Sequence, residues 1–230
     1  DNLMNPNFIN RKAELGYLEK AYKEAGKQLV IIYGRRRVGK TELAVHFAHG
    51  KDAIYFLADK RGTQSNAERF AEKCAEHFND AVPVAKNFDE VFKYLKNRIA
   101  KSRIVIVVDE FSYLVEKDAS IPSVFQLVFD EILRDANVFL VLCGSGISMM
   151  YKGALSYESP LYGRRTGEWM LKALGFKELK KFYPKASFEE LLKIYAIVGG
   201  IPAYLVKFGG KSIFEIWLYN YTDDVFNRFR

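Results

Sequence analysis

The sequence is poor in cysteine and proline and contains no long hydrophobic run. Its 230 residues include two cysteines and six prolines, and its apolar stretches are short and broken by charge or glycine. Isolated thiols at Cys74 and Cys143 exclude a small disulfide-bonded scaffold and favour a reducing compartment. No run reaches membrane-spanning length, and the start lacks the basic-then-apolar pattern of a secretory signal. We therefore predict a cytoplasmic protein with no membrane partner.

The composition is that of a globular protein with a surplus of basic and aromatic residues. Hydrophobic residues make up 49% and charged residues 27%, which excludes wholesale disorder. The 35 basic and 28 acidic residues give a net charge of +7, which permits binding to nucleic acid without establishing it. An aromatic content of 15% indicates either a large core or an aromatic surface for a partner.

Short apolar runs alternate with helical patterns over the first two thirds of the chain. Nearly continuous apolar residues predict strands buried on both sheet faces at 29–33, 53–58, 104–108 and 138–143. The segments between them predict helices at 40–47, 64–78, 88–100 and 121–134, with Pro122 in a first helical turn. This alternation predicts an α/β fold with a parallel sheet.

The pattern changes after about residue 151. Residues 156–167 read as a loop, 168–174 as a last edge strand, and 176–182, 187–198 and 213–229 as helices. Ser187 and Glu190 fit a capping box, and Gly199 with Gly200 must end the preceding helix. We therefore predict a core domain over 1–174 and a small helical subdomain over 175–230. The last helix reaches the final residue uncapped, so it either frays there or begins a longer C-terminal region.

Residues 34–41 read GRRRVGKT and match the phosphate-binding pattern G-x-x-x-x-G-K-[ST] in full, between a strand and a helical pattern. The glycines allow backbone N–H groups to surround phosphate oxygens at the positive end of the following helix. Lys40 is expected to reach the β- and γ-phosphates, and the Thr41 hydroxyl to ligate Mg²⁺. The residues of this segment predicted to bind the nucleotide are Gly34, Arg35, Arg36, Arg37, Val38, Gly39, Lys40, Thr41 and Glu42.

Two acidic residues follow the predicted strand 104–108. Asp109 and Glu110 would lie at the carboxyl edge of the sheet, where ligands bind in open α/β folds. Asp109 is expected to hold the Mg²⁺ shell, directly or through water. Glu110 is expected to polarise the attacking water, which would make the protein a hydrolase rather than a passive nucleotide binder. The alternative is a solvated acidic turn after a strand.

Small polar residues follow the predicted strand 138–143. A polar side chain at this strand end can sense the γ-phosphate or orient the water. Ser145 is the first candidate for this role, and Ser148 is the second. A serine that caps a helix or stabilises a turn is the alternative.

Five segments together resemble the archaeal-type ATPase family, which belongs to the STAND branch of the AAA+ P-loop NTPases. They read FINR at 8–11, GRRRVGKT at 34–41, VDEF at 108–111, PLYGRR at 160–165 and GGIPAY at 199–204. The resemblance covers nearly the whole chain and implies an AAA+ sheet in the order 5-1-4-3-2 with a small helical lid. Family members commonly continue into a winged-helix domain, and some end in a nuclease-like domain. Since neither pattern is present here, we expect the chain to be part of a longer protein.

The resemblance also implies residues that contact the base. Ile9, Asn10 and Arg11 match the family's N-terminal segment beside the adenine. Pro202, together with Gly200, matches a turn that replaces the usual lid arginine and packs near the base.

Two arginines stand where the family places basic residues able to reach the phosphates. Either Arg164 or Arg165 would neutralise charge that develops on the γ-phosphate. The alternatives are a salt bridge away from the phosphates or a contact with DNA.

These observations predict an ATP-binding AAA+/STAND-type ATPase module that hydrolyses ATP to ADP with Mg²⁺ and acts as a nucleotide-driven switch. One alternative is a nucleic-acid-binding or scaffold module in which the nucleotide is structural and hydrolysis negligible. Another is a switch whose protein partner docks on the aromatic terminal helix. The sequence leaves open whether the effector is DNA or protein, and what the oligomeric state is.

Overall fold

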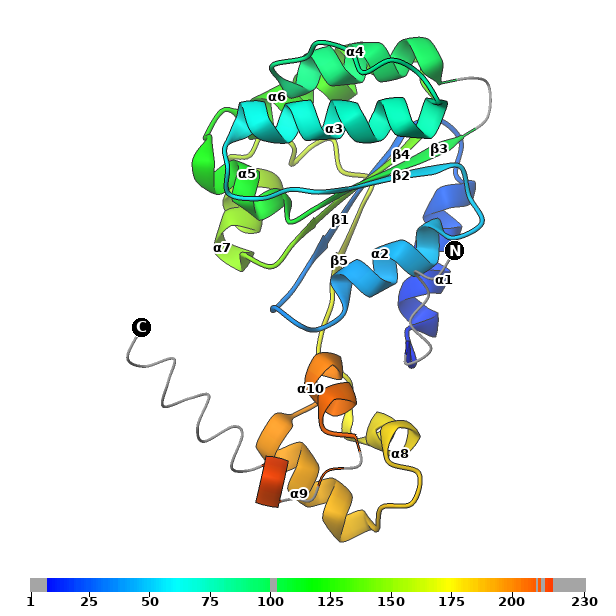
Figure 1. Cartoon of the computed structure of the whole chain (residues 1–230), viewed down its shortest axis with the longest axis vertical. Helices are drawn as coiled ribbons and strands as arrows, with labels where there is room; N and C mark the ends of the chain where they lie inside the picture. Colours follow the sequence, from blue (N-terminus) through cyan, green and yellow to red (C-terminus); the bar gives the residue numbers. More distant parts are fainter. Residues whose placement is uncertain (1–7, 100–102, 210, 212–213, 217–230) are drawn as a thin grey trace.

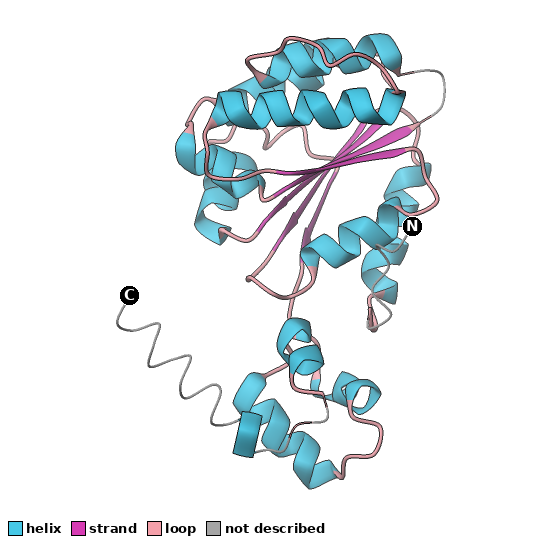
Figure 2. Ribbon diagram, viewed as in Figure 1, coloured by secondary structure: helices cyan, strands magenta, loops and turns pink. Residues whose placement is uncertain are grey.

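A computed structural model of the chain describes residues 8–99, 103–209, 211 and 214–216. The larger part is a twisted parallel sheet with helices on both faces, and a group of short helices lies beyond the carboxyl ends of the strands (Figures 1 and 2). Within the described residues, no helix is both long enough and apolar enough to cross a membrane.

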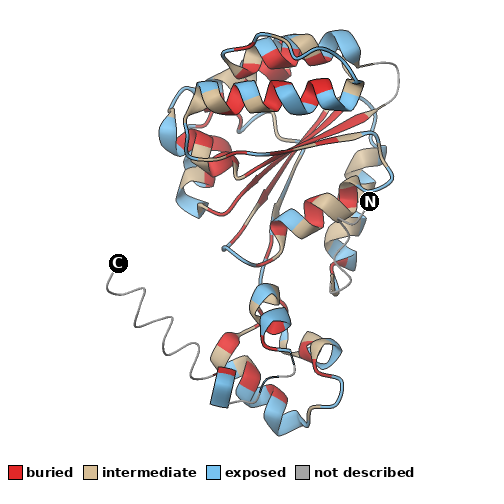
Figure 3. Ribbon diagram, in the orientation of Figure 1, coloured by how far each residue is buried: buried red, intermediate tan, exposed pale blue. Residues whose placement is uncertain are grey.

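The sheet holds five parallel strands within the described residues, in the order β2-β3-β4-β1-β5. This order confirms the predicted 5-1-4-3-2 arrangement, read from the other edge. The strands are β1 (Gln28–Tyr33), β2 (Ala53–Leu57), β3 (Ile104–Asp109), β4 (Val138–Gly144) and β5 (Gly167–Met170). Every residue of β3 and β4 is buried, because helices cover both faces of these central strands (Figure 3).

Alternate residues of each central strand serve two separate hydrophobic clusters. On β1, Leu29 and Ile31 face a cluster completed by α3 (Thr63–Phe78), α4 (Phe88–Arg98), α5 (Phe111–Lys117) and α6 (Ile121–Leu127). Val30 and Ile32 face the opposite cluster, completed by α1 (Lys12–Lys23) and α2 (Lys40–Ala48). The two-residue period of a strand divides the side chains this way, and Figure 1 shows the two helical layers.

Two predicted helices end at other residues in the structure, and a third keeps its bounds but is divided into two elements. The predicted helix 121–134 becomes α6 followed by the π-helical turn η1 (Val128–Ile132), whose wider turn directs Val128, Phe129 and Ile132 all into the core. The predicted helix 176–182 is the 3₁₀ turn η3 (Phe176–Glu178) followed by the short helix α8 (Leu179–Phe182). The helix predicted at 88–100 ends at Arg98.

The predicted edge strand 168–174 is too long. Strand β5 ends at Met170, and the Leu171 N–H still donates to the Tyr33 carbonyl at 2.7 Å. Beyond Tyr33 the neighbouring strand β1 has turned into the loop that precedes α2, so no backbone remains for pairing. The chain therefore leaves the sheet here and enters the helical part.

A third hydrophobic cluster lies entirely within the helical part. Its buried members include Leu174, Leu179, Ile194 and Leu205, from α8, α9 (Phe188–Val198), α10 (Pro202–Lys207) and the segment before them. The predicted capping box of Ser187 and Glu190 is present, and Gly199 ends α9 with a φ of 62°. The helix predicted at 213–229 falls almost wholly outside the described residues.

The β4–β5 connection contains α7 (Ile147–Met150) and the π-helical turn η2 (Tyr151–Leu155), followed by turns. This arrangement agrees with the loop predicted at 156–167.

Candidate functional site

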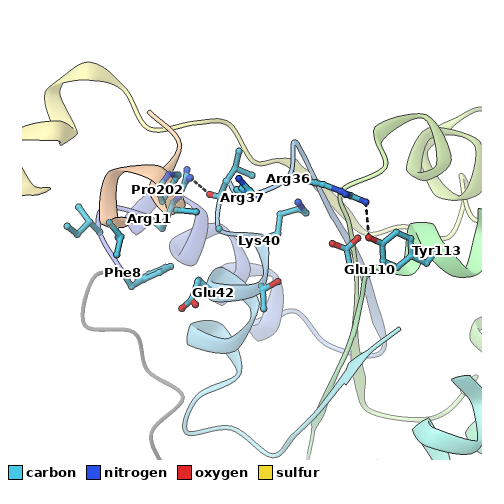
Figure 4. A pocket seen from close by; sticks show the side chains of 15 residues that line it. Phe8, Arg11, Arg36, Arg37, Lys40, Glu42, Glu110, Tyr113 and Pro202 are labelled. Carbon is cyan, nitrogen blue, oxygen red and sulfur yellow. Dashed lines mark hydrogen bonds between the residues drawn. The ribbon is translucent and has the colours of Figure 1, made fainter. Parts of the chain in front are cut away.

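A cavity of about 530 Å³ lies where the carboxyl edge of the sheet meets α10 (Figure 4). Its walls come from the segment before α1, the loop between β1 and α2, the first turns of α2 and α5, and the first helical residues of α10. This is the edge at which open α/β sheets bind ligands. Of the residues predicted to bind nucleotide, all from Arg36 to Glu42 line the cavity, together with Ile9, Arg11 and Pro202.

The loop between β1 and α2 depends on backbone conformations with positive φ. Arg37 has a φ of 67°, and Gly39, at the N-cap of α2, has a φ of 94°. Gly34 has a φ of 153°, and a Cβ there would lie 2.3 Å from the Leu171 carbonyl oxygen. Glycine is therefore required at the start of the loop, where the end of β1 passes close to the chain leaving β5.

Lys40 is buried in this loop, with 5% of its surface exposed. Its ammonium donates to the carbonyl oxygens of Gly34 and Arg35, at 3.0 and 2.9 Å. Gly34 and Arg35 were also predicted to bind the nucleotide, but they do not line the cavity. Their backbone carbonyls hold the Lys40 ammonium instead. Burial lowers the pKa of Lys40, while the negative charges of Glu110 and Asp109 oppose that shift.

Asp109 is fully buried at the end of β3 and accepts hydrogen bonds from three directions. The Thr41 hydroxyl donates to its Oδ2 at 2.6 Å and the Tyr55 hydroxyl to the same oxygen at 2.8 Å. The Glu110 N–H donates to Oδ1 at 2.8 Å. The structure thus brings together the two residues predicted to bind the metal, Thr41 and Asp109. No cluster of three or more His, Cys, Asp or Glu suited to a metal is found among the described residues.

The sequence interpretation did not include Tyr55, although it lies in the middle of a predicted strand beside β3. Burial and the neighbouring Asp109 carboxylate raise the pKa of Tyr55 far above its usual range, so the phenol keeps its proton and acts as a donor. The only sequence signal is a polar hydroxyl in the middle of an apolar strand.

Glu110 lines the cavity directly after Asp109 and has a φ of 54°, which is uncommon for a residue other than glycine. The Ser145 hydroxyl lies within hydrogen-bonding distance of both carboxylate oxygens, at 3.0 Å from Oε1 and 2.8 Å from Oε2. Ser145 follows β4, so neighbouring strands bring the pair together. Ser148, the second candidate, is exposed on α7.

Two arginines of the loop are held by tyrosines from other elements. Arg36 donates to the Tyr113 hydroxyl of α5 at 2.8 Å (Figure 4). Arg37 donates to the Tyr204 hydroxyl of α10, also at 2.8 Å, and its guanidinium lies 5.2 Å from the centre of that ring. The sequence interpretation missed both tyrosines, because the partners are 77 and 167 residues apart in the chain.

The segment before α1 lines the apolar end of the cavity. Phe8 and Ile9 belong to the lining, while Asn10 is exposed and lies outside it. Arg11 is buried and donates to the carbonyls of Val38 and Lys172, at 2.8 and 2.9 Å. Arg11 therefore ties this segment to the loop and to the chain that leaves the sheet. Pro202, Ala203 and Val206 of α10 complete the apolar wall.

The structure does not bring Arg164 and Arg165 into the cavity lining. Arg164 forms a salt bridge with Asp130 at 3.0 Å and donates to the Pro160 carbonyl. Arg165 pairs with Glu168 at 2.9 Å and donates to the carbonyls of η2. Of the alternatives that the sequence left open, this arrangement matches the salt bridge away from the phosphates.

Residues 8–208 match the model of a protein family described as an ATPase domain predominantly from Archaea. The chain belongs to this family. All five segments that carried the sequence resemblance fall within the matched residues. The match covers both the sheet and α10, so both sides of the cavity belong to the ATPase domain.

Curated relatives of this ATPase domain come from Methanocaldococcus jannaschii. An uncharacterized protein is 38% identical over 200 residues, which cover 87% of this chain and 44% of that protein. An uncharacterized ATP-binding protein is 52% identical over 44 residues, covering 19% of this chain and 75% of that protein. The ATPase domain thus spans less than half the length of the first of these relatives.

Solved structures share the fold of the ATPase domain at low sequence identity. A Walker-type ATPase of Pyrococcus abyssi is 22% identical with a TM-score of 0.65, covering 94% of this chain and 73% of that one. The ORC2 protein of Aeropyrum pernix, solved with ADPNP and ADP, is 14% identical with a TM-score of 0.66, covering 97% and 70%. A STAND protein of Pyrococcus horikoshii is 16% identical with a TM-score of 0.56, covering 94% and 32%. The fold is that of a P-loop NTPase, as predicted.

Proposed function

We propose that this ATPase domain binds ATP with Mg²⁺, hydrolyses it to ADP and phosphate, and acts as a nucleotide-driven switch. One observation carries the proposal. The side chains assigned to phosphate, metal and water come from α2, the end of β3 and the start of α5, and they meet at one edge of the cavity. They are Lys40, Thr41, Asp109 and Glu110, with Ser145 holding the last of them. Membership of an ATPase-domain family supports the same function.

In this proposal the triphosphate lies on the loop between β1 and α2. The N-terminus of α2 directs free backbone N–H groups and the positive end of its dipole at the phosphates. Lys40 would exchange its two carbonyl acceptors for phosphate oxygens. The adenine would lie at the apolar end of the cavity, between Ile9 and Pro202. The ORC2 relative, solved with ADPNP and ADP, is consistent with this assignment.

The residues present fit a magnesium ion. The Thr41 hydroxyl and the Asp109 carboxylate are hard oxygen donors 2.6 Å apart, and Mg²⁺ is bound by such oxygens together with water and phosphate. When bound, the ion would neutralise charge that develops on the phosphates. Tyr55 holds the same Asp109 oxygen as Thr41 does, so the carboxylate stays oriented when the threonine turns to a ligand.

Glu110 would orient and polarise the water that attacks the γ-phosphate. Its carboxylate lines the cavity and is held by the Ser145 hydroxyl. This contact makes Ser145 a positioning residue that acts through Glu110. The lid side chains at Pro202 and Ala203 would help to exclude bulk water from the reaction.

The same contacts provide the proposed switch. We divide the chain into a nucleotide-binding core, 1–174, and a helical lid, 175–230; the third hydrophobic cluster lies in the lid, with Leu174 at the boundary. Nucleotide in the cavity would contact both parts, and loss of the γ-phosphate would change its contacts with the loop whose Arg37 is bonded to Tyr204 of α10. Binding energy would thereby bias the lid position. Slow turnover is expected of such a switch.

The test compares two substitutions. Lys40→Ala should abolish nucleotide binding, measured by calorimetric titration with ATP and Mg²⁺. Glu110→Gln should retain binding and lose at least about 100-fold in turnover, as expected for general-base catalysis. Glu72→Gln, at an exposed position on α3, serves as the matched control. Full hydrolysis by the Glu110→Gln protein would overturn the mechanism.

The nucleic-acid alternative receives less support from the same structure. Two features motivated it: the net charge of +7 remains, but Arg164 and Arg165 are paired with Asp130 and Glu168. A relative of 17% identity, the Aeropyrum pernix ORC1 protein, was solved in complex with DNA, but at this identity the likeness supports only the fold. No measurable DNA affinity at low salt would exclude this alternative, whereas DNA-stimulated ATP turnover would combine the two functions.

A further inference from the structure

One carboxylate oxygen beside the cavity lacks a hydrogen-bond partner. Among the described residues, three buried side-chain polar atoms have no such partner: Oε2 of Glu42, Nε of Arg103 and Oε2 of Glu178. Glu178 is paired with Lys181 at 2.7 Å, and the terminal nitrogens of Arg103 donate to backbone carbonyls. Only Glu42 also lines the cavity, so a rotation of its carboxylate brings the unmet acceptor to a bound molecule.

Glu42 lies in the first turn of α2, where a negative charge is favourable, but that position does not require Oε2 to be buried without a donor. It occupies the third position of α2, where a glutamate commonly reaches back to the N-cap amide. Its Oε2 does not do so, and the N-cap residue is Gly39 of the phosphate loop. A buried acceptor without a donor costs free energy in the unliganded protein. Figure 4 shows the carboxylate pointing away from Lys40, toward Phe8.

The surroundings of Glu42 restrict what the donor can be. An ionised carboxylate repels phosphate, so the donor must belong to another part of the ligand. The neighbouring walls are apolar, formed by Phe8, Ile9 and Pro202, and Phe8 stacks on His46 one turn after Glu42, with ring centres 3.7 Å apart. Such walls fit the flat face of a base with few polar contacts. The nucleoside supplies suitable donors: the exocyclic amino group of adenine and the ribose hydroxyls.

We propose that Glu42 is the hydrogen-bond acceptor that recognises the nucleoside half of the nucleotide. The inference rests on the proposed nucleotide binding and assigns a specificity-determining residue to it. Because a carboxylate only accepts, it favours an amino group over a carbonyl oxygen at the same place on the base. Replacement by glutamine supplies a donor as well and relaxes that preference.

The experiment measures binding of ATP and of inorganic tripolyphosphate to the full chain with Mg²⁺, for the wild type, Glu42→Ala and Glu42→Gln. Glu42→Ala is expected to weaken ATP binding by about 10- to 100-fold, the range for a hydrogen bond to a charged group. Tripolyphosphate, which has no nucleoside, is expected to bind all variants equally. Glu72→Ala, on the exposed face of α3, is the matched control.

Nucleotide analogues distinguish the two donors. Purine riboside triphosphate lacks the amino group, whereas 2′-deoxy-ATP and 3′-deoxy-ATP each lack one ribose hydroxyl. The analogue that lacks the true donor should bind the wild type as weakly as Glu42→Ala binds ATP, and should be insensitive to the substitution. Equal ATP affinity in Glu42→Ala and wild type would overturn the inference. Equal losses for ATP and tripolyphosphate would also overturn it, because Glu42 would then act through the loop.

Thermal unfolding without nucleotide excludes a purely structural role. Removing a buried acceptor that lacks a donor should leave the melting temperature of Glu42→Ala unchanged or raise it, whereas a structural carboxylate would lower it. A clear decrease would therefore contradict the inference. Failure of the wild type to bind either ATP or tripolyphosphate would instead refute the proposed function, so the two failures are distinguishable.

Discussion

Single side chains with buried polar partners determine the chemistry of this site. The Ser145 hydroxyl is 2.8 Å from the Glu110 carboxylate but does not itself line the cavity. Ser145→Ala should therefore reduce kcat by about 10- to 100-fold, the value of a hydrogen bond to a charged group, and leave KM nearly unchanged. Steady-state kinetics measures both constants. Ser148→Ala, on the exposed face of α7, is the control, and a rise in KM without a fall in kcat would contradict the assignment.

The two cysteines provide a prediction about pH. Both thiols are fully buried, and burial raises the pKa of Cys74 and of Cys143 above the ordinary value of 9.0. Above pH 9 the unfolded thiols lose protons that the folded thiols keep, so the free energy of unfolding falls as the pH rises. Each thiol contributes a slope of up to about 1.4 kcal/mol per pH unit.

Urea unfolding between pH 8 and pH 10.5 measures that slope. The double variant Cys74→Ala, Cys143→Ala should be less stable at pH 8, because both changes leave cavities, and its stability should decline less steeply. Two lysines oppose the fall in the free energy of unfolding with pH. Burial lowers the pKa of Lys40 and of Lys27, so their contribution to that free energy rises with pH. An identical slope in the variant and the wild type would exclude the thiols as its source.

At the scale of elements, burial on both faces made the central strands predictable. The strands β1, β3 and β4 match their predicted ranges to within a residue or so, because their apolar runs are nearly continuous. Helix α1 was not predicted, and it has a single fully buried residue, Leu18. Strand β5 is shorter than predicted because its partner β1 ends first.

The candidate site likewise contains residues that the sequence reveals and residues that only the fold brings together. The phosphate loop and the Asp109–Glu110 pair are encoded by residues adjacent in sequence, so a single pattern reveals them. The partners Tyr55, Tyr113 and Tyr204 reach the site only through the sheet order and the lid packing. Nothing local in the sequence distinguishes these three tyrosines from the other eleven in the chain.

At the scale of the whole molecule, the sheet part and the helical part both line the cavity, and each has its own hydrophobic clusters. The Arg37–Tyr204 hydrogen bond joins the phosphate loop to α10 across it. Tyr204→Phe removes this bond but keeps the ring beneath the guanidinium. Because the bond is exposed, the global free energy of unfolding should change by less than about 1 kcal/mol.

Hydrogen exchange is the more sensitive measurement of what the Arg37–Tyr204 hydrogen bond does. Without nucleotide, amides of α9 and α10 in Tyr204→Phe should exchange about 2- to 10-fold faster, because the lid opens more often. Tyr113→Phe is the matched control, since it removes an equivalent arginine–tyrosine bond within the core. Unchanged exchange in α9 and α10 would show that the Arg37–Tyr204 hydrogen bond does not restrain the lid.

The bonds that Lys40 donates to the Gly34 and Arg35 carbonyls have a consequence for the kinetics of binding. They keep the loop in its curved shape before any ligand arrives, so an incoming polyphosphate meets a preorganised cradle and spends little entropy on ordering it. Association would then proceed at the rate of a productive encounter rather than at the rate of a folding loop. The residence time of the nucleotide would then depend on how often the lid moves away from the core. The lifetime of the nucleotide-bound state would follow from that frequency.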